Sequence, residues 1–201
     1  MDDPTGLPTT LPIPPTDNPA ALGITAILGS GALTKFDISS NFLYAAGARA
    51  LAIGLKDNQV IRELNLADNN LALGGTDMSG VIALADVIPG MEALSSANLL
   101  KNYIPVEQAQ ELVEIMRTKE NLTTLCGLSG EETELNFSSQ RLGAGDAVLI
   151  TNDIKDNGAL TKLDISNNSI EQGEALQQII GYCNTKGIEL DNHESESGGD
   201  Y

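Results

Sequence analysis

The chain of 201 residues is poor in histidine, cysteine and aromatic residues, and it has no tryptophan. Its single histidine, His193, and its two cysteines, Cys126 and Cys183, leave little from which to build a metal centre or a nucleophile–base pair. The glycine motifs that cradle phosphates, G-x-x-x-x-G-K-[ST] and G-x-G-x-x-G after a strand, do not occur. We therefore expect no metal site, no cofactor and no enzymatic activity.

Basic residues are also scarce. Lysine and arginine total 11 against 28 aspartate and glutamate residues, which gives a formal net charge of −17. Such a field repels nucleic acid and anionic membranes, because their phosphates need cations to neutralise them. The excess of acid predicts either a basic protein partner or a charge that serves only solubility.

Long apolar runs are missing as well, and none approaches the length of a membrane span. The first twenty residues lack the basic and apolar regions of a secretory signal. Two cysteines are too few for a disulfide scaffold. We expect a cytoplasmic protein that is a monomer on its own.

What the sequence does contain is a repeat. Apolar residues recur at relative positions 1, 4, 6 and 11 of a frame whose ninth position carries an amide, and the frames start at residues 33, 61, 94, 132 and 160, of which the frame at Glu132 keeps the apolar residues at positions 4, 6 and 11 only. The sixth and ninth positions are occupied by Ile38 and Asn41, Leu66 and Asn69, Leu99 and Asn102, Phe137 and Gln140, and Ile165 and Asn168. Alternation of this kind predicts a short strand that ends in a polar turn.

A helical pattern follows the frames. Ala48, Leu51, Ala52 and Leu55 fall at spacings i, i+3, i+4 and i+7, and the same spacing recurs from Val81, Ala109 and Ala147. The distance from the first helical position to the next frame start is 13 residues each time, provided that Leu122 is counted as the start of a short frame that is followed by the frame at 132 only ten residues later. Each unit leaves one apolar flank uncovered, so we expect neighbouring units to stack with their strands parallel.

The pattern L-x-x-L-x-L-x-x-N-x-L resembles the leucine-rich repeats of the ribonuclease-inhibitor class, and the helix Gly47–Leu55 is similar to the usual helix of that class. The resemblance covers about residues 20–190. It implies an α/β leucine-rich-repeat solenoid, a horseshoe segment with parallel strands on the concave side and helices on the convex side. The class hosts inhibitors, GTPase regulators and immune-receptor sensors, so the resemblance does not name a function.

The ends and two irregularities complete the predicted organisation. Residues 1–16 are predicted as a disordered or extended Pro/Thr-rich arm, 17–191 as the repeat domain and 192–201 as a disordered acidic tail. A partial first repeat is expected to place a helix at Ala20–Leu28. The segment Gly74–Gly80 holds the extra residues that make the second unit longer than the others, and it suits either a contact loop or a neutral insertion. Leu122–Leu135 has no room for a helix and suits either a short crossover or a hairpin.

The resemblance places the outward-facing strand residues on the concave side, and we expect a basic protein partner to bind there. These residues are Asp37, Glu63, Asn65, Ser96, Asn98, Glu134, Asn136, Lys162 and Asp164. Leu100 is the one large apolar residue expected on this face. A second set, Asn41, Asn69, Asn102 and Asn168, is expected to form a structural ladder, because an amide can satisfy backbone groups that the strand ends leave unpaired.

Two alternative functions stay open. The chain is similar in repeat type and acidic C-terminal region to Ran GTPase-activating protein, which implies a regulator of a small GTPase. It also suits the sensor or scaffold segment of a larger protein.

Overall fold

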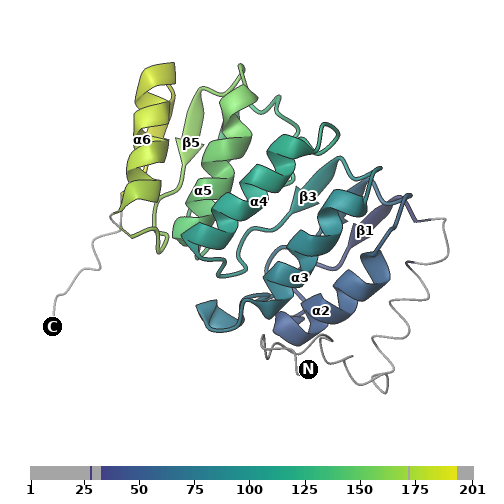
Figure 1. Cartoon of the computed structure of the whole chain (residues 1–201). Helices are drawn as coiled ribbons and strands as arrows, with labels where there is room; N and C mark the ends of the chain where they lie inside the picture. Colours follow the sequence, from purple (N-terminus) through teal and green to yellow (C-terminus); the bar gives the residue numbers. More distant parts are fainter. Residues whose placement is uncertain (1–27, 29–32, 172, 194–201) are drawn as a thin grey trace, which may run out of the picture.

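The computed structural model describes Leu28, residues 33–171 and residues 173–193, in which short strands alternate with helices. Figure 1 shows the helices side by side in one layer and the strands in a second layer behind them. The strands are β1 (Lys35–Asp37), β2 (Glu63–Asn65), β3 (Ser96–Asn98), β4 (Glu134–Asn136), β5 (Lys162–Asp164) and β6 (Glu189–Asp191). The helices are α2 (Tyr44–Leu55), α3 (Ser79–Val87), α4 (Val106–Thr118), α5 (Ala144–Asp153) and α6 (Glu174–Lys186), with 3₁₀ turns η1 (Leu73–Gly75), η2 (Ile88–Gly90) and η3 (Ile154–Asp156).

The strands form two parallel three-stranded sheets, in the orders β1-β2-β3 and β4-β5-β6. Equivalent positions of successive repeats lie opposite one another: Phe36 pairs with Leu64, and Leu64 with Ala97. In the second sheet Leu163 pairs with both Leu135 and Leu190. The predicted alternation of parallel strands and helices is confirmed.

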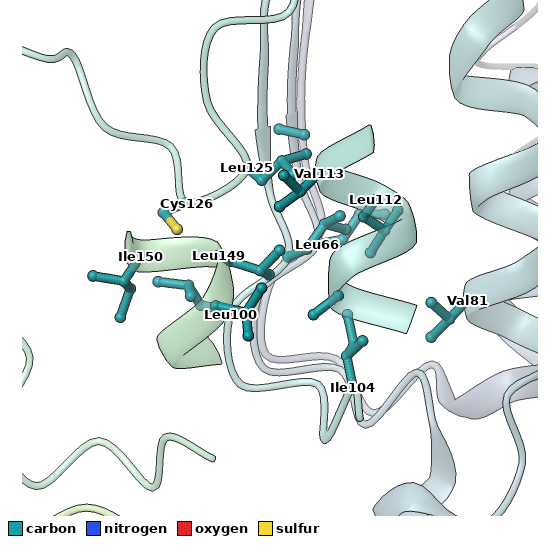
Figure 2. Packing of buried hydrophobic residues seen from close by; sticks show 14 of the residues in the cluster. Leu66, Val81, Leu100, Ile104, Leu112, Val113, Leu125, Cys126, Leu149 and Ile150 are labelled. Atoms are coloured by element: carbon teal, nitrogen blue, oxygen red, sulfur yellow. The ribbon is translucent and has the colours of Figure 1, made fainter. Parts of the chain in front are cut away.

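The core lies between the two layers. Ala48, Leu51, Ala52 and Leu55 turn inward from α2 and are almost fully buried, as the helical spacing predicts. Figure 2 shows strand-side residues such as Leu66 and Leu125 pointing toward Leu112 of α4 and Leu149 of α5. Small residues set the helix spacing at one contact, because a Cβ added to Gly80 of α3 would lie 2.8 Å from the Cα of Ala45 in α2.

The segment between Leu122 and Leu135 joins the two sheets. Thr124 forms a parallel bridge with Ser96, and Leu99 N–H donates to Leu125 O at 3.0 Å, so this segment extends along β3. The chain then passes through residues 127–133 without a helix and enters β4, which pairs with β5. The short crossover, one of the two predicted alternatives, therefore describes this segment better than a hairpin does.

Helix α5 fastens this junction through two buried carboxylates. Asp153 accepts hydrogen bonds from Leu125 N–H (2.9 Å), Cys126 N–H (2.7 Å) and Thr124 Oγ1–H (2.5 Å). Within the described part of the chain, these groups have no strand on their other side to pair with, because the chain enters β4 without first forming a helix. Asp146 accepts from Lys101 N–H (2.8 Å) and from Gly143 N–H (2.9 Å). A carboxylate that accepts several N–H bonds replaces a strand edge locally.

Burial raises the pKa of both carboxyl groups, and the hydrogen bonds they accept oppose that rise. The helix lies deep in the molecule, since every residue from Gly145 to Asp153 is buried. A Cβ added to Gly145 would stand 1.9 Å from the carbonyl oxygen of Ile104, so only glycine fits at this contact.

One predicted side-chain position is wrong. Leu100 was expected on the outward strand face, but it is 3% exposed, and Figure 2 places it beside Leu149 and Ile150 of α5. It follows β3 at the junction, where α5 covers it.

The expected arm at residues 1–16 lies outside the described residues, and so does the expected helix at 20–28 apart from Leu28, which is described and buried. The expected tail lies outside them from residue 194 onward. Over the described ranges, no helix has the length and apolar character needed to cross a membrane.

Candidate interaction surface

The strand layer turns a polar surface away from the helices. The outward-facing residues predicted from the repeat are all exposed or half-buried in the structure: Asp37, Glu63, Asn65, Ser96, Asn98, Glu134, Asn136, Lys162 and Asp164. The parallel register brings equivalent members together within each sheet, so that Glu63 lies opposite Ser96 and Glu134 lies opposite Lys162. Each sheet therefore presents a continuous row of polar groups.

Charges on this surface are partly paired across strands. Lys35 Nζ lies 2.7 Å from Glu63 Oε1, and Lys162 Nζ lies 3.1 Å from Glu189 Oε1. The hydrogen bond and the charge of Glu189 raise the pKa of Lys162. Exposed pairs of this kind contribute little stability.

Five of the predicted surface residues also have a structural task. Asp37, Asn65, Asn98, Asn136 and Asp164 occupy one repeat position at the end of each strand, and each accepts a hydrogen bond from the N–H two residues further on, at 2.9–3.2 Å. Such a turn holds the backbone where the strand stops. Two bonds from Ser39 lower the pKa of Asp37, which keeps this carboxylate ionised.

A shallow hollow of about 290 Å³ lies over the first sheet. Phe36 and Leu64 contribute to it from the middle of β1 and β2, and Glu63, Asn65 and Asn98 line it as polar groups. Gly127 borders the hollow beside Asn98, since a Cβ at that glycine would lie 3.2 Å from the Asn98 Cβ. Because most of its lining residues are polar, the hollow differs from the mostly apolar pockets that hold small ligands.

The asparagines predicted as a ladder connect neighbouring turns. Asn69 Oδ1 accepts from Asn41 N–H at 3.0 Å, and Asn102 Oδ1 accepts from Asn69 N–H at 2.9 Å. In the second half Asn168 Oδ1 accepts from Gln140 N–H at 2.9 Å. The carboxamides of Asn69, Asn102 and Asn168 each donate to a carbonyl of the preceding unit, at 2.8–2.9 Å, and to carbonyls of their own turn. These side chains hold repeats together and lie away from the strand surface.

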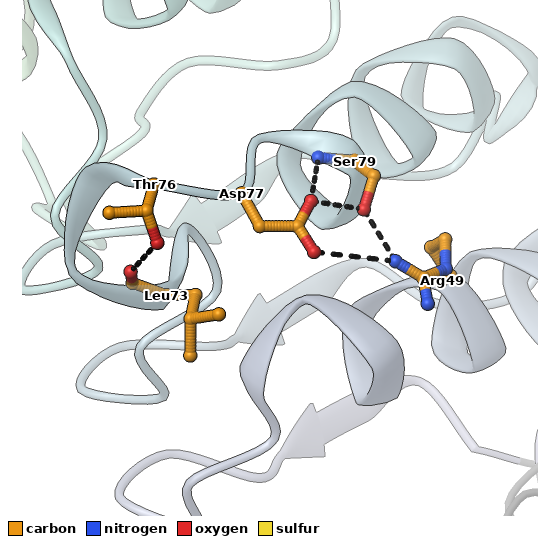
Figure 3. Close-up of polar contacts among 5 residues, drawn as sticks. All are labelled: Arg49, Leu73, Thr76, Asp77 and Ser79. Atoms are coloured by element: carbon orange, nitrogen blue, oxygen red, sulfur yellow. Dashed lines mark hydrogen bonds and ion pairs between the residues drawn. The ribbon is translucent and has the colours of Figure 1, made fainter.

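The excess segment Gly74–Gly80 folds against its neighbours (Figure 3). Asp77 accepts from Ser79 N–H at 2.9 Å, and Arg49 of α2 bonds Ser79 Oγ and lies 3.8 Å from Asp77 Oδ2. Thr76 Oγ1 donates to Leu73 O at 2.7 Å. The segment is thus tied to α2 at one end and closed by its own turn at the other.

Aromatic residues gather where the first and third units turn from strand to helix, and the repeat pattern did not single them out. Phe42, Tyr44 and Tyr103 are 68%, 43% and 50% exposed. The rings of Phe42 and Tyr44 have centroids 6.2 Å apart. The available signal was positional: Phe42 and Tyr103 each stand five residues after the strand-ending Asp37 or Asn98, in a chain with few aromatics.

The helix layer carries a second hollow, of about 680 Å³, over the recessed α5. Glu111, Glu114 and Arg117 of α4 line one side, and Tyr182 of α6 lines the other. Tyr182 Oη lies 2.9 Å from Ile154 O and 3.0 Å from Lys155 O, which fixes that wall. Charges of both signs line this hollow, so its electrostatics favour no ligand class.

Among the residues that the structure describes, no group of three or more histidine, cysteine, aspartate or glutamate residues is placed to hold a metal ion. Both cysteines are buried and unbonded, and burial raises the pKa of each thiol.

No protein-family model matches the chain, and no curated protein matches its sequence. The structure establishes an α/β chain in which short parallel strands alternate with helices.

Proposed function

We propose that the chain is a leucine-rich-repeat solenoid of the ribonuclease-inhibitor type, and that it is a non-catalytic module which binds a basic protein partner through its strand face. The repeat assignment is supported by hydrogen bonds between units that join residues 28 positions apart, such as Asn41 to Asn69 and Gln140 to Asn168. Stacked units of this kind leave one extended strand surface open to a partner.

The observation that carries the proposal is the excess of carboxylates on that surface. Its outward strand positions hold six acidic residues and two basic ones, which are Asp37, Glu63, Glu134, Asp164, Glu189 and Asp191 against Lys35 and Lys162. Both lysines are paired with a glutamate, so four further carboxylates face outward or lie half-buried. A surface of one sign steers an oppositely charged partner and makes its association sensitive to salt.

The test is a charge reversal that leaves the turns intact. Glu63→Lys combined with Glu134→Lys changes two exposed residues and avoids the strand-ending residues whose side chains hold the backbone. The matched control is Glu111→Lys with Glu120→Lys, which alters the total charge equally on and beside α4.

Tagged full-length chains would be used to capture partners from the native cell at low and at moderate salt, and the captured protein would then be titrated in purified form. We expect a basic partner whose affinity falls with added salt, falls at least about tenfold in the strand-face variant, and is unchanged in the control. Equal affinity of the two variants would refute binding through the strand face.

A further inference from the structure

Four large apolar side chains are exposed where the chain turns from β1, β2 and β3 into the segments that follow, two in loops, one at the start of α2 and one in η1. They are Phe42, Tyr44, Leu73 and Tyr103, and we call them the aromatic rim. Three of the seven aromatic residues of the chain are therefore placed at one edge of the strand layer. Interfaces take most of their binding energy from a few aromatic and arginine side chains, and the outward strand residues predicted from the repeat are all polar.

The loops of the aromatic rim form one surface, because hydrogen bonds join them. Tyr44 N–H donates to Asn69 O at 3.0 Å, and Ala72 N–H donates to Asn102 O at 3.3 Å. Gly75, two residues after Leu73 in η1, approaches the third loop, since a Cβ there would lie 3.9 Å from Tyr103 O. The rim is thus continuous across three units.

The backbone does not require aromatic residues at these positions. Phe42, Asn70 and Tyr103 are equivalent in register and have φ values of 51°, 53° and 56°. This left-handed region disfavours bulky side chains and is tolerated best by glycine and asparagine. The second repeat carries the suited residue, Asn70, whereas the first and third carry Phe42 and Tyr103 in spite of the strain, and the fourth carries Arg141 with a φ of 61°. Strained residues that the fold does not need point to a contact with another molecule.

Acidic groups accompany the rim. Asp68, in the middle loop, accepts from Ser40 Oγ–H of the first loop at 3.2 Å, and Asp37 precedes that loop with a lowered pKa. Lys101 is the basic residue equivalent to Asp68 in the third loop. Guanidinium groups suit this combination, because they stack on aromatic rings and bind carboxylates in a bidentate manner, whereas an ammonium group is a compact hydrated charge.

We propose that the aromatic rim binds an arginine-rich segment of a protein partner, with guanidinium groups on the rings of Phe42, Tyr44 and Tyr103 and against the neighbouring carboxylates. The inference rests on the proposed function, which it deepens by naming the chemistry of the partner. It adds a site at the edge of the strand layer that discriminates arginine from lysine.

The experiment compares two probes of equal charge. Fluorescein-labelled nona-arginine and nona-lysine are titrated with the full chain at low and moderate salt, and binding is followed by anisotropy. We expect both peptides to bind at low salt and nona-arginine to bind about fivefold more tightly, from cation–π contacts with the exposed rings.

The test variant carries Phe42→Asn and Tyr103→Asn, which copy the residue that the chain itself has at position 70. This variant should melt at the same or a higher temperature, because the strain is relieved, and should lose the preference for arginine while it retains the affinity for nona-lysine. The control carries Ile53→Ala and Ile82→Ala, two exposed apolar residues of α2 and α3, and should keep the preference.

The outcomes separate this inference from the proposed function. Equal binding of the two peptides to the wild-type chain, or an unchanged arginine preference in the asparagine variant, overturns the inference and leaves the acidic strand face standing. Failure of both peptides to bind at low salt overturns both. Two other outcomes also overturn the inference. If the wild-type chain sediments as a dimer and the asparagine variant as a monomer, a second copy of the chain covers the rim. If the asparagine variant melts at a lower temperature than the wild-type chain, the chain itself covers the rim.

Discussion

Replacement of Asn102 by alanine should destabilise the chain more than replacement of any other asparagine of the ladder by alanine. Asn102 is fully buried, and its Oδ1 accepts from Asn69 N–H at 2.9 Å and from Leu71 N–H at 3.3 Å. Its Nδ2 donates to the carbonyls of Leu66, Leu99 and Leu100 at 2.9, 2.9 and 3.2 Å. Alanine leaves these backbone groups without their side-chain partner.

The magnitude of this loss follows from the two N–H groups, those of Asn69 and Leu71, that are left without an acceptor. A buried group that loses its hydrogen-bond partner costs about 1–3 kcal/mol, and the longer bond to Leu71 falls at the lower end. We therefore expect Asn102→Ala to lower the free energy of unfolding by about 3 kcal/mol. Asn41→Ala is the matched control: Asn41 is exposed, and its carboxamide donates to Ile38 O and Ser39 O, which water can satisfy instead. Asn41→Ala should lower the free energy of unfolding by about 0.5 kcal/mol.

Urea unfolding followed by far-ultraviolet circular dichroism measures both variants. The comparison is valid where the dependence on urea concentration is unchanged, since a changed slope indicates partial unfolding of the repeat array. Equal destabilisation by Asn41→Ala and Asn102→Ala would refute the reasoning, because exposure and hydrogen bonding would then not decide the effect.

Three further predictions concern α5, α6 and the buried thiols. Gly145→Ala should destabilise the chain by about 3 kcal/mol in urea unfolding, because its Cβ would collide with Ile104 O, whereas Gly181→Ala in α6, with open space around it, should stabilise it by about 0.5–1 kcal/mol; the same sign for both would contradict the packing. Burial raises the pKa of Asp153 above its ordinary 3.8. Between pH 3.8 and the raised pKa, the folded chain therefore holds more protons than the unfolded chain, and its stability falls as pH rises through this window. The stability of the wild-type chain relative to Asp153→Asn should fall over the same window, and a difference that is constant with pH would count against the burial. Cys126 and Cys183 should resist a thiol reagent until urea unfolds the chain, since both are buried with raised pKa values, and rapid labelling without urea would be inconsistent with the core.

The recurring part of the fold could be read from the sequence because it repeats. One apolar residue is a weak signal, but Leu51, Leu84 and Leu112 hold the same place in successive units, and all three are buried. The parallel pairing of Phe36, Leu64 and Ala97 follows from the same register. The outward exposure of Glu63 and Glu134 was predictable for the same reason, since strand residues alternate between two faces.

The junction could not be predicted, because it occurs once. Asp146 and Asp153 carry no periodic signal, and nothing in their local sequence distinguishes a buried carboxylate that replaces a strand edge from an exposed one on a helix. The burial of Leu100 depends on the same unique contact with α5. Repeat periodicity describes what the units share, so it does not predict the contacts at the junction of the two sheets, where the units differ.

The aromatic rim was missed for a different reason. Strand alternation directs attention to residues within the strands, whereas Phe42 and Tyr103 project from the turns beyond them. The direction in which they point depends on a positive φ, which no apolar pattern reveals.

The stacking of parallel units is tested most directly by nuclear magnetic resonance detection of scalar couplings through hydrogen bonds. We expect couplings from the N–H groups of Ile38, Leu66 and Ile165 to the carbonyl carbons of Asn65, Asn98 and Asp191, across N···O distances of 3.0, 2.9 and 2.8 Å. Observation of all three would establish the register between neighbouring units. Couplings from these N–H groups to other carbonyls, with the intrahelical couplings of α2 and α4 present as an internal standard, would contradict it.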